Sequence, residues 1–300
     1  MDPVLWHHRP TLRRPVLVAS FEGWNDAGDA ATMASRHLQD LWDAEVFATI
    51  DPEEFHDFTE DRPTIRLTDG LTREITWPEH TLSACARPDE RMDVVFLVAV
   101  EPQLRWRTYA AAVVGVAKAL DCSLVVTLGS LLSDTPHTRP VKITGTAHDA
   151  NLAERLGLSR SRYEGPTGIL GVLHDQLAKA GVPSASLWAA VPHYVGRNPS
   201  PPAALALVER VAALLAVEVD LTELLAAATE YLAEIDDAIE TDDEARDYVR
   251  GLEDAEDEPA VPDPLHLGEL RRPEDDGVIV AGADELAAEA ERFLRNEEGR

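Results

Sequence analysis

The sequence predicts an α/β fold: a mainly parallel sheet with helices on both faces, a small β-hairpin lobe and an all-helical domain at the C-terminal end. Short, continuous apolar runs typical of buried parallel strands recur along the first 200 residues. Helical patterns of about ten to fifteen residues lie between them, as in βαβ units. Beyond residue 202 the apolar residues keep a helical spacing, which predicts the helical domain.

The first apolar run, Val16–Ala19, continues to Phe21 and predicts a buried strand. A helix is expected after it, because alanines follow two suitable N-cap residues, Asn25 and Asp26. Asp29 adds negative charge to the first helical turn, where it is favourable. A strand, a tight turn and a helix form the opening unit of an α/β sheet, and ligands of such sheets bind at this edge.

The turn between this strand and helix, Glu22-Gly23-Trp24, is rich in nearby carboxylates. A phosphate-binding loop is excluded, because Glu22, Asp26 and Asp29 surround the helix N-terminus and GWNDAG matches no Gly-rich phosphate motif. Two interpretations stay open. Either the carboxylates cap the helix while Trp24 packs against a neighbouring element or subunit, or Glu22 and Asp26 belong to a pocket or a metal site.

The remaining elements follow in order. The predicted strands are Glu45–Ile50, Asp93–Val100, Ser123–Leu128 and Ser186–Val191, and the predicted helices are Trp106–Leu120, His148–Leu156 and Ile169–Ala180. Thr64–Trp77 is predicted as a hairpin at the edge of the main sheet, because residues alternate on both sides of an Asp-Gly turn. The proline-containing stretch Leu131–Ile143 is predicted as a loop.

A domain boundary is predicted at Asn198–Pro202, where several prolines interrupt regular structure. The expected division is an α/β domain over residues 1–200, an acidic helical domain over 203–258, and a linker with a terminal amphipathic helix over 259–300. The helical segments are predicted at Ala203–Val217, Leu221–Leu252 and Asp284–Leu294, and Leu286, Phe293 and Leu294 of the last one are candidate interface residues together with Trp24.

Composition limits the function classes. The chain has 300 residues, 45% of them hydrophobic, and a net charge of −28, so it can bury a sizeable core but opposes binding of nucleic acid or anionic membranes. The acidity is concentrated in residues 201–300, which carry 29 acidic and 8 basic side chains. Cys85 and Cys122 have no CxxC partner and are expected to be reduced. With no signal peptide or membrane span in the pattern, the cytoplasm is the expected location.

Polar residues follow the predicted strands and would meet at one edge of a parallel sheet. These candidate pocket residues are Glu22, Asn25, Asp26, Glu101, Ser130, Asp134, His137, Glu164 and His193. Ser130, His137 and Asp134 could form a Ser-His-Asp arrangement, and the carboxylates and histidines could perform acid-base chemistry. However, Ser130 lacks the GxSxG motif and HExxH is absent, so no catalytic, metal or cofactor site is assigned. The other histidines are expected to be surface or structural residues.

Four segments together resemble one family. FEGWNDAGDAAT, LGSLLSDTPHTRPVKITGTA, YEGPTGILGVLHDQL and LWAAVPHYVGRNPSPPAALAL occur in this order and resemble the bacterial branch of the proteasome assembly chaperone 2 family, particularly its actinobacterial members. The resemblance covers residues 5–255. It implies a fold related to nucleoside phosphorylases and similar hydrolases, a small C-terminal helical domain, and homo-oligomers with trimers among the expected assemblies. By extension from the eukaryotic and archaeal relatives, it also implies binding to proteasome components as a chaperone or adaptor.

One feature departs from that family. Relatives that dock on a proteasome ring use a C-terminal hydrophobic-Tyr-any tail, whereas this sequence ends Asn296-Glu297-Glu298-Gly299-Arg300, so docking by that route is not expected. The first hypothesis is a non-enzymatic, oligomeric protein that assists assembly of a complex such as the proteasome. The alternative is a small-molecule enzyme of the phosphorylase or hydrolase kind, which requires the candidate pocket residues to converge at the strand ends.

Overall fold

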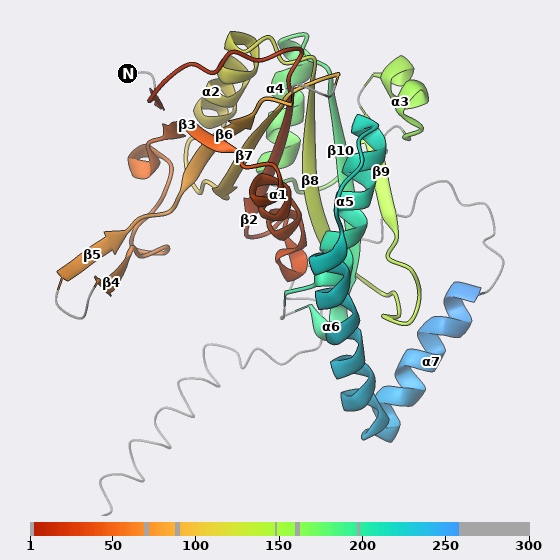
Figure 1. Cartoon of the computed structure of the whole chain (residues 1–300). Coiled ribbons are helices and arrows are strands. Elements are labelled where there is room, and N and C mark those ends of the chain that lie inside the picture. The colour runs from red at the N-terminus through yellow and green to blue at the C-terminus, as the bar shows by residue number, and fades with distance from the viewer. Residues whose placement is uncertain are drawn as a thin grey trace, which may run out of the picture. The chain divides into compact units, whose positions relative to one another are not determined.

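A computed structural model describes residues 3–68, 72–87, 91–147, 149–159, 163–196 and 199–257, which all belong to one compact unit. The predicted linker and terminal helix, with Leu286, Phe293 and Leu294, lie outside the described residues. Figure 1 shows a central sheet with helices on both sides, as the sequence predicts.

Eight strands form the central sheet, in the order β1-β3-β6-β7-β2-β8-β10-β9. Their bounds are β1 Val4–Trp6, β2 Val16–Glu22, β3 Glu45–Ile50, β6 His80–Cys85, β7 Val94–Val100, β8 Leu124–Ser133, β9 Ile143–Ala147 and β10 Ser184–Pro192. The four central strands β7, β2, β8 and β10 are parallel neighbours. With β3, five described strands run in one direction, and β1, β6 and β9 run in the opposite direction.

The central strands are buried on both sides, which explains their continuous apolar character. In β2, Val16 and Val18 enter one hydrophobic core, whereas Leu17, Ala19 and Phe21 enter the other. Successive side chains of a central strand therefore enter the two cores alternately, and each core needs a layer of helices to cover it.

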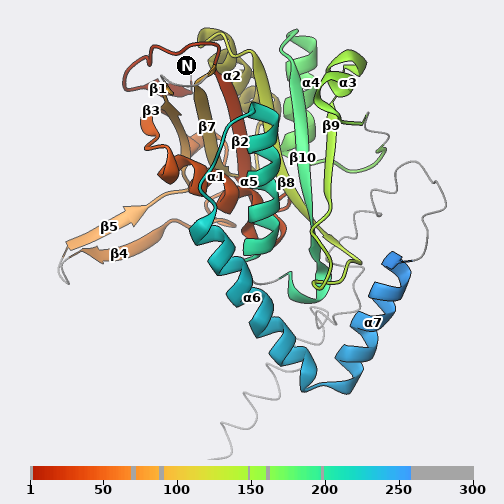
Figure 2. The ribbon, with the colours of Figure 1, turned by 45° about the vertical axis from the view of Figure 1, so that its right-hand side comes forward.

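Helices cover both faces of the sheet, as Figures 1 and 2 show. The first core contains buried residues of α1 (Ala30–Leu41), α3 (Ala150–Leu156) and α5 (Pro201–Leu215). The second contains those of α2 (Trp106–Ala119) and α4 (Ile169–Lys179). This arrangement confirms the predicted α/β class.

The predicted hairpin is present as β4 (Thr64–Thr68) and β5 (Thr72–Thr76). It forms a separate two-stranded sheet rather than a continuation of the main one. Figures 1 and 2 show it extending away from the central strands.

Several boundaries differ from the sequence prediction. Strands β1, β6 and β9 were not predicted, because they are short or mix polar with apolar residues. β8 continues to Ser133, so the loop predicted from Leu131 begins later, since these residues still pair with β10 up to Pro192. α1 begins only at Ala30, because a 3₁₀ turn over Ala27–Asp29 precedes it.

The last described helices are α6 (Thr222–Glu240) and α7 (Asp243–Asp257). α5 packs on α1 and on the sheet and also contacts α6, so the chain beyond the predicted boundary at Asn198–Pro202 contributes to the first core. The three-part domain division remains a prediction. None of the described helices is both long and apolar enough to cross a membrane.

Candidate functional site

The turn after β2 is hydrogen-bonded to both neighbouring strands, β7 and β8. The backbone of Glu22 accepts from Glu101 N at the end of β7 (2.9 Å), and that of Asn25 accepts from Ser130 N in β8 (2.9 Å). Gly23 has φ +116°, a conformation that L side chains rarely adopt, which explains the glycine at this position. The turn thus lies at the carboxyl ends of three parallel strands, where sites of α/β proteins occur.

Asp26 is buried in this turn and caps α1. Its carboxylate accepts hydrogen bonds from Ala31 N (2.6 Å), from Thr32 N (3.3 Å) and from the Thr32 hydroxyl (2.5 Å). Ser130 Oγ also lies 3.3 Å from it and donates to Ala27 O at 2.8 Å. Burial raises the pKa of Asp26 to about 6, although the hydrogen bonds from Thr32 and Ala31 favour the charged form. Capping is therefore the role these contacts support.

This pKa predicts a measurable pH dependence. Below pH 6 the folded state binds a proton at Asp26 before the unfolded state does, so this carboxyl stabilises the fold as pH falls from 7 to 4, by about 2 kcal/mol. Asp26→Asn should remove this contribution, so that acidification costs the variant about 2 kcal/mol more unfolding free energy than it costs the wild type. Urea unfolding at pH 7 and pH 4 measures the difference.

Asp43→Asn is the matched control, because Asp43 is an exposed carboxylate just after α1, adopts φ 48°, which Asn tolerates, and does not contribute to the pKa shift of Asp26. It separates loss of the buried cap from loss of one negative charge. Equal pH dependence of wild type and Asp26→Asn would contradict the assignment.

Glu101 joins this turn to the start of α4. Its Oε1 accepts hydrogen bonds from Asn25 Nδ2 (2.8 Å) and from Ile169 N (2.8 Å), the first backbone amide of α4. Burial raises the pKa of Glu101, and the bonds from Ile169 and Asn25 oppose the increase. Gly168 lies so close that an added Cβ would be 2.4 Å from Asn25 Nδ2 and 2.7 Å from Glu101 Oε1. The sequence marked Gly168 only as the start of a helix.

Glu22 lies at the outer side of the same corner. It is half-exposed and forms an ion pair with Arg36 of α1. Together they line a hollow of about 540 Å³ with polar residues of α1 and with Glu223 and Leu224 of α6. Trp24 is 44% exposed at this corner, so the predicted packing against a subunit remains a prediction.

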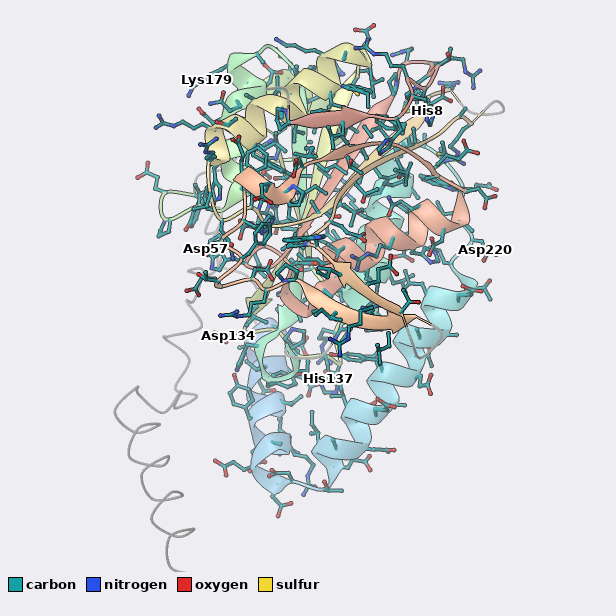
Figure 3. The ribbon with its side chains drawn as sticks, turned by 90° about the vertical axis from the view of Figure 1, so that its left-hand side faces the viewer. His8, Asp57, Asp134, His137, Lys179 and Asp220 are labelled. Carbon is teal, nitrogen blue, oxygen red and sulfur yellow. The ribbon has the colours of Figure 1, made fainter. Side chains whose placement is uncertain are left out.

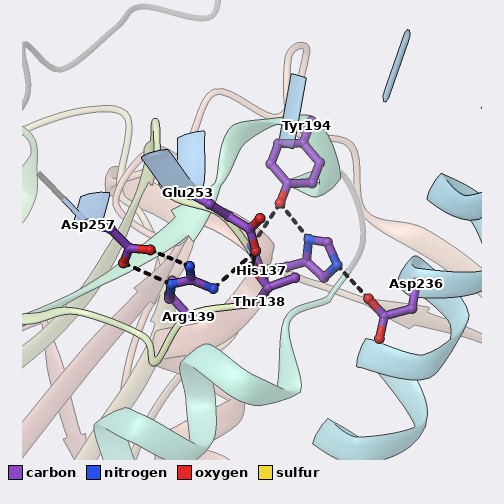
Figure 4. Close-up of polar contacts among 7 residues, drawn as sticks. All are labelled: His137, Thr138, Arg139, Tyr194, Asp236, Glu253 and Asp257. Carbon is purple, nitrogen blue, oxygen red and sulfur yellow. Dashed lines mark hydrogen bonds and ion pairs between the residues drawn. The ribbon is translucent and has the colours of Figure 1, made fainter. Parts of the chain in front are cut away.

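A second cluster lies beyond β8, where α6 and α7 meet the sheet domain. His137 contacts the Tyr194 hydroxyl twice. Its backbone N donates to that oxygen (2.7 Å), and its Nδ1 lies 2.7 Å from the same oxygen. That hydroxyl can then donate to Nδ1, which leaves the proton on Nε2, 2.9 Å from Asp236 Oδ1 of α6. Figure 4 shows these contacts.

His193 links the same region to α7. Its Nδ1 lies 3.2 Å from Asp134 Oδ1, and its Nε2 lies 3.1 Å from the Tyr248 hydroxyl. Asp134 and His137 lie at the end of the sheet domain that faces α6 and α7 (Figure 3). Burial raises the pKa of Tyr194 to about 12, so this hydroxyl stays protonated at neutral pH.

Arg139 and Lys142 hold the acidic helix α7 through ion pairs. The Arg139 guanidinium contacts Asp257 at 2.6 Å and Glu253 at 3.1 Å, and Lys142 lies 3.2 Å from Glu256. Thr138 also bonds Glu253 (Figure 4). The partners on α6 and α7 were not predicted, because in sequence they belong to acidic helix faces that usually contact only water.

The nine candidate pocket residues therefore do not form one group. Asn25, Asp26, Glu101 and Ser130 meet at the strand-end corner with Glu22 beside them, whereas Asp134, His137 and His193 belong to the second cluster and Glu164 is exposed. Ser130 bonds Asp26 and Ala27, so the Ser-His-Asp arrangement drawn from the sequence is not assembled around its hydroxyl. Within the described residues, no cluster of three or more His, Cys, Asp or Glu side chains is placed to hold a metal ion.

A chain of titratable groups links β6 and α2 to the segment that precedes the hairpin. His80 Nδ1 is 2.7 Å from the Tyr109 hydroxyl, and His80 Nε2 is 2.6 Å from His56 Nε2. His56 Nδ1 in turn lies 3.5 Å from Asp61 Oδ2. Burial lowers the pKa of His80 to about 3, helped by the neighbouring His56, whose pKa burial also lowers. The sequence offers no spacing motif that would have found this chain.

Known proteins are similar to this chain over most of its length. The sequence model of the PAC2 family matches residues 20–239. A PAC2 family protein from Streptomyces avermitilis is 45% identical, and a proteasome-assembly chaperone homologue from Mycobacterium tuberculosis is 48% identical; each match covers 78% of this chain and 99% of the other, with a TM-score of 0.72.

A more distant structure, an archaeal proteasome activator from Pyrococcus furiosus, shares the fold at 17% identity and a TM-score of 0.65, covering 79% of this chain and 99% of that one. None of the curated proteins matches the chain. The family match over residues 20–239 agrees with the resemblance seen in the four sequence segments. The chain therefore belongs to the PAC2 family.

Proposed function

We propose that this chain is a non-enzymatic, protein-binding assembly chaperone that acts on proteasome components. The observation that carries the proposal is the 48% identity, over 99% of its length, with the proteasome-assembly chaperone homologue from Mycobacterium tuberculosis. The proposal assigns to this chain the role that is named for the Mycobacterium protein.

The arrangement of polar residues supports protein binding over small-molecule chemistry. The carboxylates at the strand-end corner accept hydrogen bonds from the backbone of α1 and α4, and they thereby brace the fold. The histidines of the second cluster hold α6 and α7 to the sheet domain. The enzyme alternative depends on convergence of these two groups, which the contacts do not support.

Self-association belongs to the same proposal, with a trimer as the expected assembly, and the cytoplasm is the proposed location. Trp24, 44% exposed at the end of β2, is the proposed subunit contact. Light scattering of the purified chain at micromolar concentration tests this part, and a monomer would contradict it.

The main experiment is an assembly assay. Unassembled α and β proteasome subunits from the organism that encodes this chain are mixed with and without the purified protein, and particle formation is followed by native electrophoresis and peptidase activity. We expect a complex with free subunits and faster appearance of active particles. An unrelated acidic protein of similar size controls for the net charge of −28. No bound subunit and no change in rate would refute the proposal.

A further inference from the structure

The β4–β5 hairpin has one apolar face. Ile65 lies opposite Ile75 and Leu67 opposite Arg73 in the register, and Trp77 follows Ile75 by two residues, so these apolar side chains share one face. They are 45% to 62% exposed. A two-stranded hairpin is marginally stable in water, and an apolar face on one is expected to contact something else.

The sheet beside the hairpin also exposes apolar residues. Leu5 of β1 and Val46 of β3 are 50% and 48% exposed, although their neighbours Val4 and Phe47 are buried in the second core. Residues of α1, α3 and α5 form the first core together with the central strands and β9. Neither Leu5 nor Val46 is part of that core. Six of the eleven exposed large apolar side chains of the described chain therefore belong to the hairpin or to this part of the sheet.

The two surfaces enclose a groove of about 700 Å³. Its apolar lining includes Leu5, Val46, Ile75 and Trp77, contributed by both the sheet and the hairpin. Its acidic residues are Asp51, Glu53, Glu74 and Glu79, and none of the lining residues in the described part of the chain is Lys or Arg. The groove, defined by these residues, combines an apolar lining with an acidic rim.

We propose that this groove binds a segment of a partner protein that presents apolar side chains flanked by Lys or Arg. The apolar lining supplies the area that must be removed from water, and the four carboxylates select positive charge. The proposal goes beyond the assembly role, because it assigns the surface and the chemistry of its ligand whichever protein carries that segment.

Charge disfavours two other occupants. A symmetric contact between two copies would bring the acidic rims of both grooves together. The sequence Asp284–Leu294 of this chain carries Asp284, Glu285, Glu289 and Glu291 against one Arg, so it too would add negative charge at the rim.

Labelled peptides of ten residues test the proposal directly by fluorescence anisotropy with the full chain. One peptide alternates Leu with Lys, the second replaces Lys by Glu, and the third replaces Leu by Ser. We expect the Leu-Lys peptide to bind at least tenfold more tightly than either of the others, and its affinity to fall with added salt.

Two double variants locate the site. Val46→Ser/Ile75→Ser should weaken binding of the Leu-Lys peptide at least tenfold, because both changed side chains are exposed in the groove. Glu53→Lys/Glu79→Lys changes the summed charge of the four acidic positions from −4 to 0, so the preference for the Leu-Lys peptide should disappear. Binding of the Leu-Glu peptide should become tighter than in the wild type, a gain that an unfolded variant cannot produce. Glu230→Lys/Glu234→Lys, the same change in charge on exposed positions of α6, is the control and should leave the preference unchanged.

Three results would overturn the proposal: equal affinity of the wild type for the Leu-Lys and Leu-Glu peptides, loss of the preference in the α6 control, or unchanged binding in Val46→Ser/Ile75→Ser. A change in the mass of Val46→Ser/Ile75→Ser by light scattering would also overturn it, since the face would then be a contact between copies. None of these measurements uses a proteasome subunit, so failure here is distinct from failure of the proposed assembly role.

Discussion

Acidification from pH 7 to pH 4 is expected to cost the wild-type chain about 3 kcal/mol of unfolding free energy through His80, and His80→Gln should not show this loss. The folded-state pKa of His80 is about 3, whereas an unfolded histidine titrates near 6.5. As pH falls below 6.5 the unfolded state binds a proton that the folded state does not, so stability is lost progressively down to the folded-state pKa.

The geometry explains why the folded state resists protonation. His80 is 2% exposed, and both of its ring nitrogens already have partners, Tyr109 and His56. The Tyr109 hydroxyl can donate to Nδ1, and His80 Nε2 can donate to His56, whose other nitrogen faces Asp61. A proton added to His80 Nδ1 would place a positive charge in a buried site next to a second imidazole, where water cannot solvate it.

Urea unfolding at pH 7 and pH 4 gives the loss of unfolding free energy on acidification for each protein. The effect of His80 is the loss in the wild type minus the loss in His80→Gln. His80→Gln loses part of the hydrogen bonding at both pH values, and this offset cancels in the comparison. His174→Gln is a suitable control, because His174 also bonds two side chains, Thr127 and Ser184, outside this chain of groups. If His80→Gln loses as much stability on acidification as the wild type does, the interpretation of the buried pair is wrong.

Asp26 and His80 act in opposite directions over the same pH range. The raised pKa of Asp26 stabilises the fold on acidification by about 2 kcal/mol, against the loss of about 3 kcal/mol through His80. The two groups together therefore change wild-type stability by only about 1 kcal/mol. The two variants should separate these contributions. On acidification Asp26→Asn should lose more stability than the wild type, and His80→Gln should lose less.

The sequence predicts the parts of the fold that depend on local pattern. The strands β2, β7, β8 and β10 were recognised because a parallel strand buried on both faces must be apolar throughout. β6 was missed because polar side chains, among them His80 and Ser83, are buried in it and are satisfied by tertiary contacts. Such contacts leave no periodic signal in the sequence.

The candidate site shows the same limit. The proximity of Asn25, Glu101 and Ser130 could be predicted, because the carboxyl ends of parallel strands meet at one edge. The separation of His137 from them could not, since its partner Asp236 is 99 residues away on a helix whose charged residues are all acidic. Strand order alone does not say which strand ends are close enough for contact.

Glu101→Ala is expected to lower the free energy of unfolding by about 3 kcal/mol, because it leaves two donors without their shared acceptor. These donors are Asn25 Nδ2 and Ile169 N, and the second is a backbone amide at the start of α4 that has no partner within its own helix. Glu101→Gln keeps an oxygen in the same place and should cost only about 1 kcal/mol. Denaturant unfolding measures both values, and equal losses for Ala and Gln would contradict this role of the carboxylate.

Gly168→Ala tests the same packing of α4 against Glu101, by a change at the start of α4. The added Cβ would lie 2.4 Å from Asn25 Nδ2 and 2.7 Å from Glu101 Oε1, closer than van der Waals contact permits, so a loss of about 2 kcal/mol is expected. Glu101→Ala removes one of the two obstructing groups, so the double variant should be at least 1 kcal/mol more stable than the sum of the single losses predicts. Additive losses would mean that the contact with Glu101 does not contribute to the loss, since the backbone of Gly168 (φ −90°, ψ −169°) is open to any residue. Gly115→Ala is the control, because its Cβ would meet nothing within 4 Å in the described chain and alanine favours the helix. Less-than-additive losses would show that the turn after β2, the end of β7 and the start of α4 are packed as one unit around Glu101.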